Sequence, residues 1–224
     1  MVTNRSYVRR QGRMMPAQRQ ALDELWTSYG IREAGVLNPG LLFGRQAPLY
    51  LEIGFGMGDA LLEMAGAHPE NDYLGVEVHL PGVGQLLLRI REKGITNIRI
   101  DRRDAIEVLE LLPAGSLSGA FLLFPDPWSK KRHHKRRLVQ PPFVNKLGRL
   151  LKPGGFFHAA TDWADYAQHI LEVMEASDGF VNLADSGSFH PRPPDRPMTR
   201  FEQRGLNRGH VVKNLLYKRA NSIL

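Results

Sequence analysis

Four acidic residues stand at the ends of four successive apolar runs of the chain: Glu52, Glu77, Asp104 and Asp126. Short apolar runs predict β-strands, and parallel strands bring their carboxyl ends to one edge of a sheet. We therefore expect the four carboxylates to surround one crevice. Glu77 stands 25 residues after Glu52, where an acid can accept hydrogen bonds from both ribose hydroxyls. Asp104 could face an adenine amino group.

These carboxylates favour a nucleoside ligand that is not strongly anionic. A pyrophosphate cofactor would be repelled by so many negative charges. S-adenosylmethionine suits the crevice better, because it carries ribose, adenine, an ammonium and a sulfonium. Glu77, taken alone, is more simply explained as an exposed acid at a strand end.

Three glycines follow the first predicted strand, at positions 54, 56 and 58. Gly54, Gly56 and Gly58 allow a sharp turn with positive φ and let a ligand approach the backbone closely. The helix expected after them offers free N–H groups to a polar ligand. The spacing is GxGxG, which differs from the GxGxxG of dinucleotide-binding folds. Alone it is a weak signal, because a tight structural turn has similar spacing.

The segment FPDPWSKKRHHKRR, residues 124–137, is the most specific stretch of the chain. Prolines on both sides of Asp126 fix the backbone and direct its carboxylate. Phe124 and Trp128 offer surfaces on which a base could stack, or they belong to the core. The basic run that follows argues against a metal site at its two histidines.

Positive charge is concentrated in three segments, although the net charge is only +7. Residues 1–20 carry five arginines and no acid, residues 130–137 carry six Lys or Arg, and residues 190–219 carry eight against two acids. Concentrated positive charge attracts a polyanion, and nucleic acid is the first candidate. Three solvated loops are the alternative.

Composition excludes several classes of protein. The 224 residues include no cysteine, which excludes disulfides, thiolate metal sites and a cysteine nucleophile. No apolar run approaches the ~20 residues that span a bilayer, and the N-terminus lacks the apolar region of a secretory signal. We expect a cytoplasmic protein that does not bind membranes.

The remaining pattern alternates strands with helices and predicts a doubly wound α/β sheet. Residues 1–15 read as a flexible basic arm and 30–48 as a loop. Strands are predicted at 49–53, 73–78, 98–102, 119–124, 156–160, 180–183 and 211–217. Helices are predicted at 16–29, 59–67, 82–93, 105–112, 143–151 and 163–176, with a turn at 152–155 and a proline- and arginine-rich loop before the last strand.

The motifs together resemble the bacterial tRNA (guanine-N7-)-methyltransferase family. The likeness runs from RSYVRR at 5–10 through LEIGFGMG, GVEVH, FPDPWSKKRHHKRR and TDW at 161–163 to TRFEQRG at 199–205. It implies a Rossmann-like class I methyltransferase fold, with a mostly parallel seven-stranded sheet whose last strand is antiparallel, in a single domain over 16–224. It also implies methyl transfer from S-adenosylmethionine to N7 of a guanosine in the variable loop of tRNA. S-adenosylhomocysteine would be the product, and neither a metal, DNA nor a protein partner would be needed.

The same resemblance assigns residues. Asp126 would be catalytic. The donor pocket would comprise Glu52, Gly54, Gly56, Gly58, Glu77, Asp104, Ala105 and Asp126. The tRNA would be bound by Lys130, Arg132, His133, Lys135, Arg136, Arg137, Asp162, Thr199, Arg200, Phe201 and Glu202. Asn214 departs from the aspartate that many members have there.

Four alternatives can be weighed from the residues. An adenine N6-methyltransferase would carry an Asn/Asp-Pro-Pro-aromatic run, which Asp126-Pro127-Trp128 only partly matches. A non-catalytic RNA-binding protein could have kept the fold, but the intact Glu52, Glu77 and Asp126 argue against it. An NAD-dependent oxidoreductase is disfavoured by the glycine spacing, and a metal hydrolase by the lack of a ligand cluster.

Overall fold

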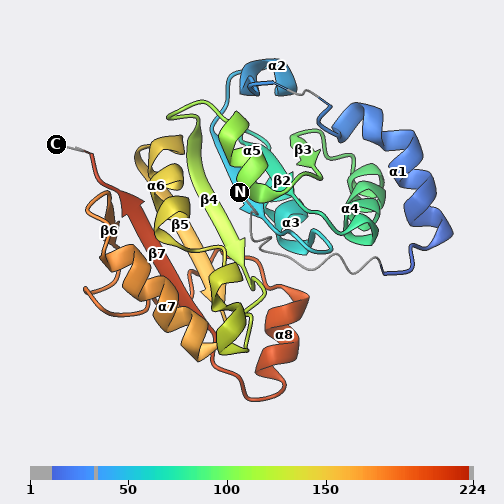
Figure 1. The fold of residues 1–224 in the computed structure, drawn as a ribbon. Helices are drawn as coiled ribbons and strands as arrows, with labels where there is room; N and C mark the ends of the chain where they lie inside the picture. The colour runs from blue at the N-terminus through green and yellow to red at the C-terminus, as the bar shows by residue number, and fades with distance from the viewer. Residues whose placement is uncertain (1–11, 33–34, 222–224) are drawn as a thin grey trace.

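A seven-stranded sheet forms the centre of the computed structural model, which describes residues 12–32 and 35–221 (Figure 1). The predicted arm at 1–15 lies mostly outside these residues. The strands are β1 (Leu49–Ile53), β2 (Asp72–Val76), β3 (Ile98–Asp101), β4 (Leu117–Leu123), β5 (Leu151–Thr161), β6 (Phe180–Asn182) and β7 (Lys213–Arg219). Their order is β3-β2-β1-β4-β5-β7-β6. Strand β7 runs in the opposite direction to the other six strands, which confirms the predicted sheet.

Helices cover both faces of this sheet. One layer is α1 (Pro16–Tyr29), α3 (Asp59–Ala67) and α4 (Leu80–Lys93), and the other is α5 (Ala105–Leu111), α6 (Pro141–Leu150) and α7 (Ala164–Glu175). Alternate residues of β1 serve the two layers: Leu51 joins the core under α5 to α7, and Tyr50 packs on the other. Because both faces are buried, the strands read as near-continuous apolar runs. Within the described ranges, no helix is both long and apolar enough to cross a bilayer.

Three local predictions were wrong. The expected loop at 30–48 contains α2 (Pro39–Phe43), whose first turn is capped by Asn38. The expected turn at 152–155 lies inside β5. The expected loop before β7 contains α8 (Arg200–Leu206). The basic run, for which no element is predicted, forms a 3-10 turn, η1 (Lys131–Arg136). Helices α2 and α8 are short, so their apolar periodicity is too brief to be recognised, and the Pro-Gly-Gly run inside β5 has the composition of a turn.

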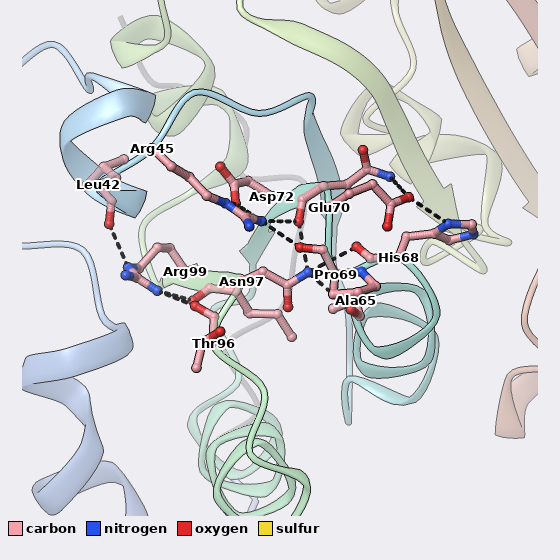
Figure 2. A network of polar contacts seen from close by, with 12 residues as sticks. Leu42, Arg45, Ala65, His68, Pro69, Glu70, Asp72, Thr96, Asn97 and Arg99 are labelled. Carbon is pink, nitrogen blue, oxygen red and sulfur yellow. Dashed lines mark hydrogen bonds and ion pairs between the residues drawn. The ribbon is translucent and has the colours of Figure 1, made fainter.

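The amino-terminal edge of the sheet is closed by polar contacts (Figure 2). Asn97 donates to the carbonyls of Ala65, His68 and Asn71 at 2.8–3.2 Å. Arg45 pairs with buried Asp72 at 2.7 Å. These bonds join α3, β2 and β3 at the end of the sheet opposite the carboxyl ends of its parallel strands.

Candidate active site

A cavity of about 770 Å³ lies at the carboxyl ends of β1, β2 and β4, where parallel sheets bind their ligands. The predicted residues that line it are Glu52, Gly54, Gly56, Glu77, Ala105, Asp126, Thr199, Arg200 and Phe201. Its wall is completed by α8, an element that the sequence did not predict. The structure thus brings most of the predicted donor residues together with part of the predicted tRNA-binding set.

The glycine loop has the backbone conformation that its spacing predicts. Gly54, Gly56 and Gly58 have φ values of 72°, 58° and 76°, in the left-handed region that disfavours other residues. Gly58 is also the N-cap of α3. The loop therefore presents the free N–H groups of a helix start to the cavity.

The Glu77 carboxylate fastens this loop to the end of β2. Its Oε2 accepts a hydrogen bond from the Gly56 amide at 2.9 Å, and its Oε1 accepts one from the His79 amide at 2.8 Å. Burial raises the pKa of Glu77, and the backbone donors oppose that effect. Each oxygen has lone-pair capacity left for a further donor from a ligand.

Glu52 is buried at the base of the cavity, and its Oε2 has no hydrogen-bond partner within the described part of the chain. Burial, followed by the nearby carboxylates of Glu77 and Asp59, raises its pKa to about 8. Burying a carboxyl oxygen without a hydrogen-bond partner costs free energy, unless a ligand supplies the partner. A cationic ligand fits this site, because it would restore the ionised form.

The third predicted acid lies differently from expectation. β3 ends at Asp101, which is buried and paired with Arg103, so Asp104 does not end the strand. Asp104 is instead the N-cap of α5, accepting from the Ile106 amide at 2.8 Å. Its neighbour Ala105 lines the cavity, and Asp104 does not.

Asp126 is exposed at the cavity between two residues with unusual backbone angles. Phe124 and Trp128 have backbone φ values of 53° and 48°, which residues other than glycine rarely adopt. The Asp126 Oδ1 accepts a hydrogen bond from the Trp128 amide at 3.2 Å. The strained turn and the two prolines hold the carboxylate at the end of β4.

The stacking surface proposed at Trp128 is not available. Trp128 is buried, its ring is covered by the Arg136 guanidinium at 4.9 Å, and the edge of His133 meets it at 5.8 Å. Phe124 is half-buried and lines the cavity. Of the two aromatics, Phe124 is the one that a ligand in the cavity can reach.

The basic run divides into exposed and buried cations. Lys130, Arg132 and Lys135 are exposed, whereas Arg137 is only 3% exposed. Arg137 donates to the Pro127 carbonyl, pairs with Asp165 and lies over the Tyr166 ring at 4.9 Å. Arg137 therefore braces the fold and does not present its charge to a partner.

His133 lies among these cations. Desolvation, then Arg132 and Arg136, lowers its pKa. No group of three or more potential metal ligands occurs within the described ranges.

The start of α8 depends on two of the predicted tRNA-binding residues. The Thr199 hydroxyl caps the helix by accepting from the Glu202 amide at 3.1 Å. Glu202 is buried and paired with Arg196 and Arg192. Neither side chain is displayed on the surface.

The other predicted residues of this region are accessible. Arg200 is exposed and pairs with Asp59 at 3.2 Å, and Phe201 is exposed beside Gly56. Asp162 follows β5 and is bonded to His210 at 2.7 Å, outside the cavity. Sequence reasoning missed Arg204, which lines the cavity, and the structural role of Arg196; their only signal was the arginine-rich composition.

Known proteins with a similar sequence identify the family of this chain. A family model described as "Putative methyltransferase" matches residues 46–215. The tRNA (guanine-N(7)-)-methyltransferase of Alcanivorax borkumensis is 53% identical over 96% of this chain and 91% of its own length. The enzyme of the same name from Aeromonas hydrophila is 53% identical over 97% of this chain and 92% of its own length.

Solved structures with low identity share the fold. The antibiotic-resistance methyltransferase Kmr has a TM-score of 0.53 at 18% identity, over 80% of this chain and 89% of its own. A variant of the 16S rRNA (adenine(1408)-N(1))-methyltransferase from Catenulisporales acidiphilia has a TM-score of 0.55 at 15% identity, over 84% and 94%. The fold is thus the Rossmann-like class I methyltransferase fold. Taken with the sequence relatives, it shows that the chain belongs to the bacterial tRNA (guanine-N7-)-methyltransferase family.

Proposed function

We propose that this protein transfers a methyl group from S-adenosylmethionine to N7 of a guanosine in tRNA. The observation that carries the proposal is the cavity at the sheet edge, which is lined by buried Glu52, whose Oε2 has no described partner, and by Asp126, which shortly precedes the cationic turn η1 in the chain. The names of the sequence relatives support the same reaction. The nucleotide would lie in the variable loop, as the resemblance implies, and the protein would act in the cytoplasm without DNA, membrane or a protein partner.

The chemistry of the cavity fits the donor. The glycine loop leaves room for close approach to the backbone, and Glu77 could accept from the ribose hydroxyls. Glu52 would complete its hydrogen bonding with the donor ammonium. Ala105, the first residue of α5, would lie against the adenine. S-adenosylmethionine supplies an electrophilic methyl group on a sulfonium, and S-adenosylhomocysteine leaves.

Guanine N7 needs no general base, because it has a lone pair and no proton at neutral pH. The protein must therefore orient the base and exclude water from the reacting pair. Positive charge moves from sulfur to the guanine imidazole as the new bond forms. Asp126 would position the base and stabilise this emerging charge, provided that it lies nearer the ring than the sulfur.

The exposed cations would bind the RNA backbone. Lys130, Arg132 and Lys135 come from the turn that directly follows Asp126, so phosphates held there would place a base over the cavity. Phosphate contacts position the substrate without reading its sequence. Base contacts would come from Phe201, which lines the cavity, and from Asp162, which packs against Gly205 of α8 outside it.

The direct test is incubation with labelled S-adenosylmethionine and bulk unmodified tRNA, followed by nucleoside analysis. We expect label in 7-methylguanosine alone. A transcript made with 7-deazaguanosine, which lacks the N7 atom, should accept no label. Label in a methyladenosine, or none with a donor that binds normally, would contradict the proposal.

A further inference from the structure

His210 lies in the segment between α8 and β7 and bonds to the acid that follows β5. Its Nδ1 is 2.7 Å from the Asp162 Oδ2. A carboxylate can only accept, so this nitrogen carries the proton in either charge state of the ring. The Asp162 Oδ1 has no hydrogen bond from any described residue, which leaves one oxygen free.

The end of α8 packs on the same carboxylate. Gly205 lies so close that an added β-carbon would be 3.0 Å from the Asp162 Oδ2. The His210 amide donates to the Gly205 carbonyl at 3.0 Å, which ties the ring to the helix. The glycine and the histidine therefore both lie against the same oxygen of the Asp162 carboxylate.

This contact joins two parts of the open edge of the sheet. Asp162 follows β5, which pairs with β4, the strand that leads to Asp126. The same helix that holds Asp162 lines the cavity through Arg200 and Phe201. Asp162 is only partly exposed, so a bound substrate would meet it in the orientation that His210 sets.

We propose that His210 is a positioning residue that fixes the Asp162 carboxylate to accept a hydrogen bond from the substrate RNA. RNA offers suitable donors in its base amino and imino groups and its 2′-hydroxyls. A carboxylate fixed in advance loses less conformational freedom when it binds than a mobile one. The inference rests on the proposed function, and it concerns affinity for tRNA, not the methyl-transfer step.

The test compares His210→Ala, His210→Asn, Asp162→Ala and the double variant by steady-state methylation of a tRNA transcript. His210→Ala should raise KM for tRNA about tenfold with kcat nearly unchanged, the size expected for a hydrogen bond to a charged group. His210→Asn keeps a donor near the Nδ1 position and should recover most of the affinity. The double variant should be no weaker than Asp162→Ala, because the two residues act as one unit.

His68→Ala is the matched control. His68 Nδ1 also lies against a carboxylate, that of Glu70, at 3.1 Å, but at the closed edge of the sheet. Its removal should leave KM and kcat unchanged. Donor affinity, measured by calorimetry, should remain unchanged in His210→Ala, which separates positioning from loss of α8.

Four results would overturn the inference. His210→Ala with wild-type KM would do so, as would additive losses in the double variant. Weakened donor binding in His210→Ala would show that the residue supports α8 in general. If Asp162→Ala binds tRNA normally, the inference fails while the proposed function stands; if the wild type methylates no tRNA, the proposed function itself fails.

Discussion

Arg196 and Glu202 form an ion pair in which each side chain is only 1% exposed. It fastens the loop before α8 to the first turn of that helix. Glu202→Ala would leave the Arg196 guanidinium buried without its partner, a change that typically costs about 3–5 kcal/mol. We expect α8 to lose protection from amide exchange and the donor to bind more weakly.

Arg192→Ala is the comparison for this variant, because Arg192 pairs with the same carboxylate but is 35% exposed. Its effect should be much smaller, since an exposed pair contributes about 0–1 kcal/mol. Equal exchange protection of α8 in Glu202→Ala and the wild type would show that the buried pair does not hold the helix.

The basic run should respond to substitution in two distinct ways. Arg137→Ala removes a buried guanidinium that contacts Pro127, Asp165 and Tyr166, so the melting temperature should fall. Replacing exposed Lys130, Arg132 and Lys135 by Ala together should leave the melting temperature unchanged. It should weaken tRNA binding and reduce the slope of log K against log salt by about 2–3, because three phosphate contacts are lost.

If the basic run is divided in this way, melting temperature and the salt dependence of tRNA binding should respond to different substitutions. A fall in melting temperature for the triple variant would mean that these cations also brace the turn. An unchanged salt slope would mean that the tRNA backbone does not lie on them.

Ionisation of Glu52 should lower the free energy of unfolding as the pH rises. Its pKa of about 8 in the folded protein exceeds the value of about 4.3 in an unfolded chain. Between these values the folded state binds more protons than the unfolded state, so the free energy of unfolding falls with increasing pH. Glu52→Gln removes this dependence. Its stability relative to the wild type should therefore rise from pH 5 to pH 8, by about 1.4 kcal/mol per pH unit at most.

Denaturant unfolding at several pH values measures this difference. Glu63→Gln is the control, because Glu63 lies in the neighbouring helix α3 and is exposed. A stability difference between Glu52→Gln and the wild type that stays constant with pH would contradict the prediction.

Much of the fold and part of the site could be predicted from local sequence. The glycine loop and Glu77 were recognisable because strand, turn and helix follow one another within a few residues. The same is true of Asp126, which the two flanking prolines mark.

What could not be predicted depends on distant contacts. Arg137 has the same side chain as exposed Arg132, and its contacts with Pro127 and with Asp165 and Tyr166 of α7 give it a different role. Helix α8 has seven residues, too few for a periodic pattern, and it is held by Arg196 and by Asp162. Asp101 and Asp104 are both plausible ends of β3 in the sequence, and only the strand register distinguishes them.

Asp126 offers the sharpest test of the chemical step. Asp126→Asn keeps an acceptor for the Trp128 amide, so the turn should persist, but it removes the negative charge. If the charge stabilises the developing imidazolium, kcat should fall by about 10²-fold while donor affinity changes little. Because guanine N7 has no proton to lose, the pH profile of the remaining activity should lack the limb that a general base would produce. Single-turnover methylation across pH, with donor affinity measured in parallel, distinguishes the roles: a loss confined to donor affinity, with turnover intact, would mean that Asp126 only holds the donor.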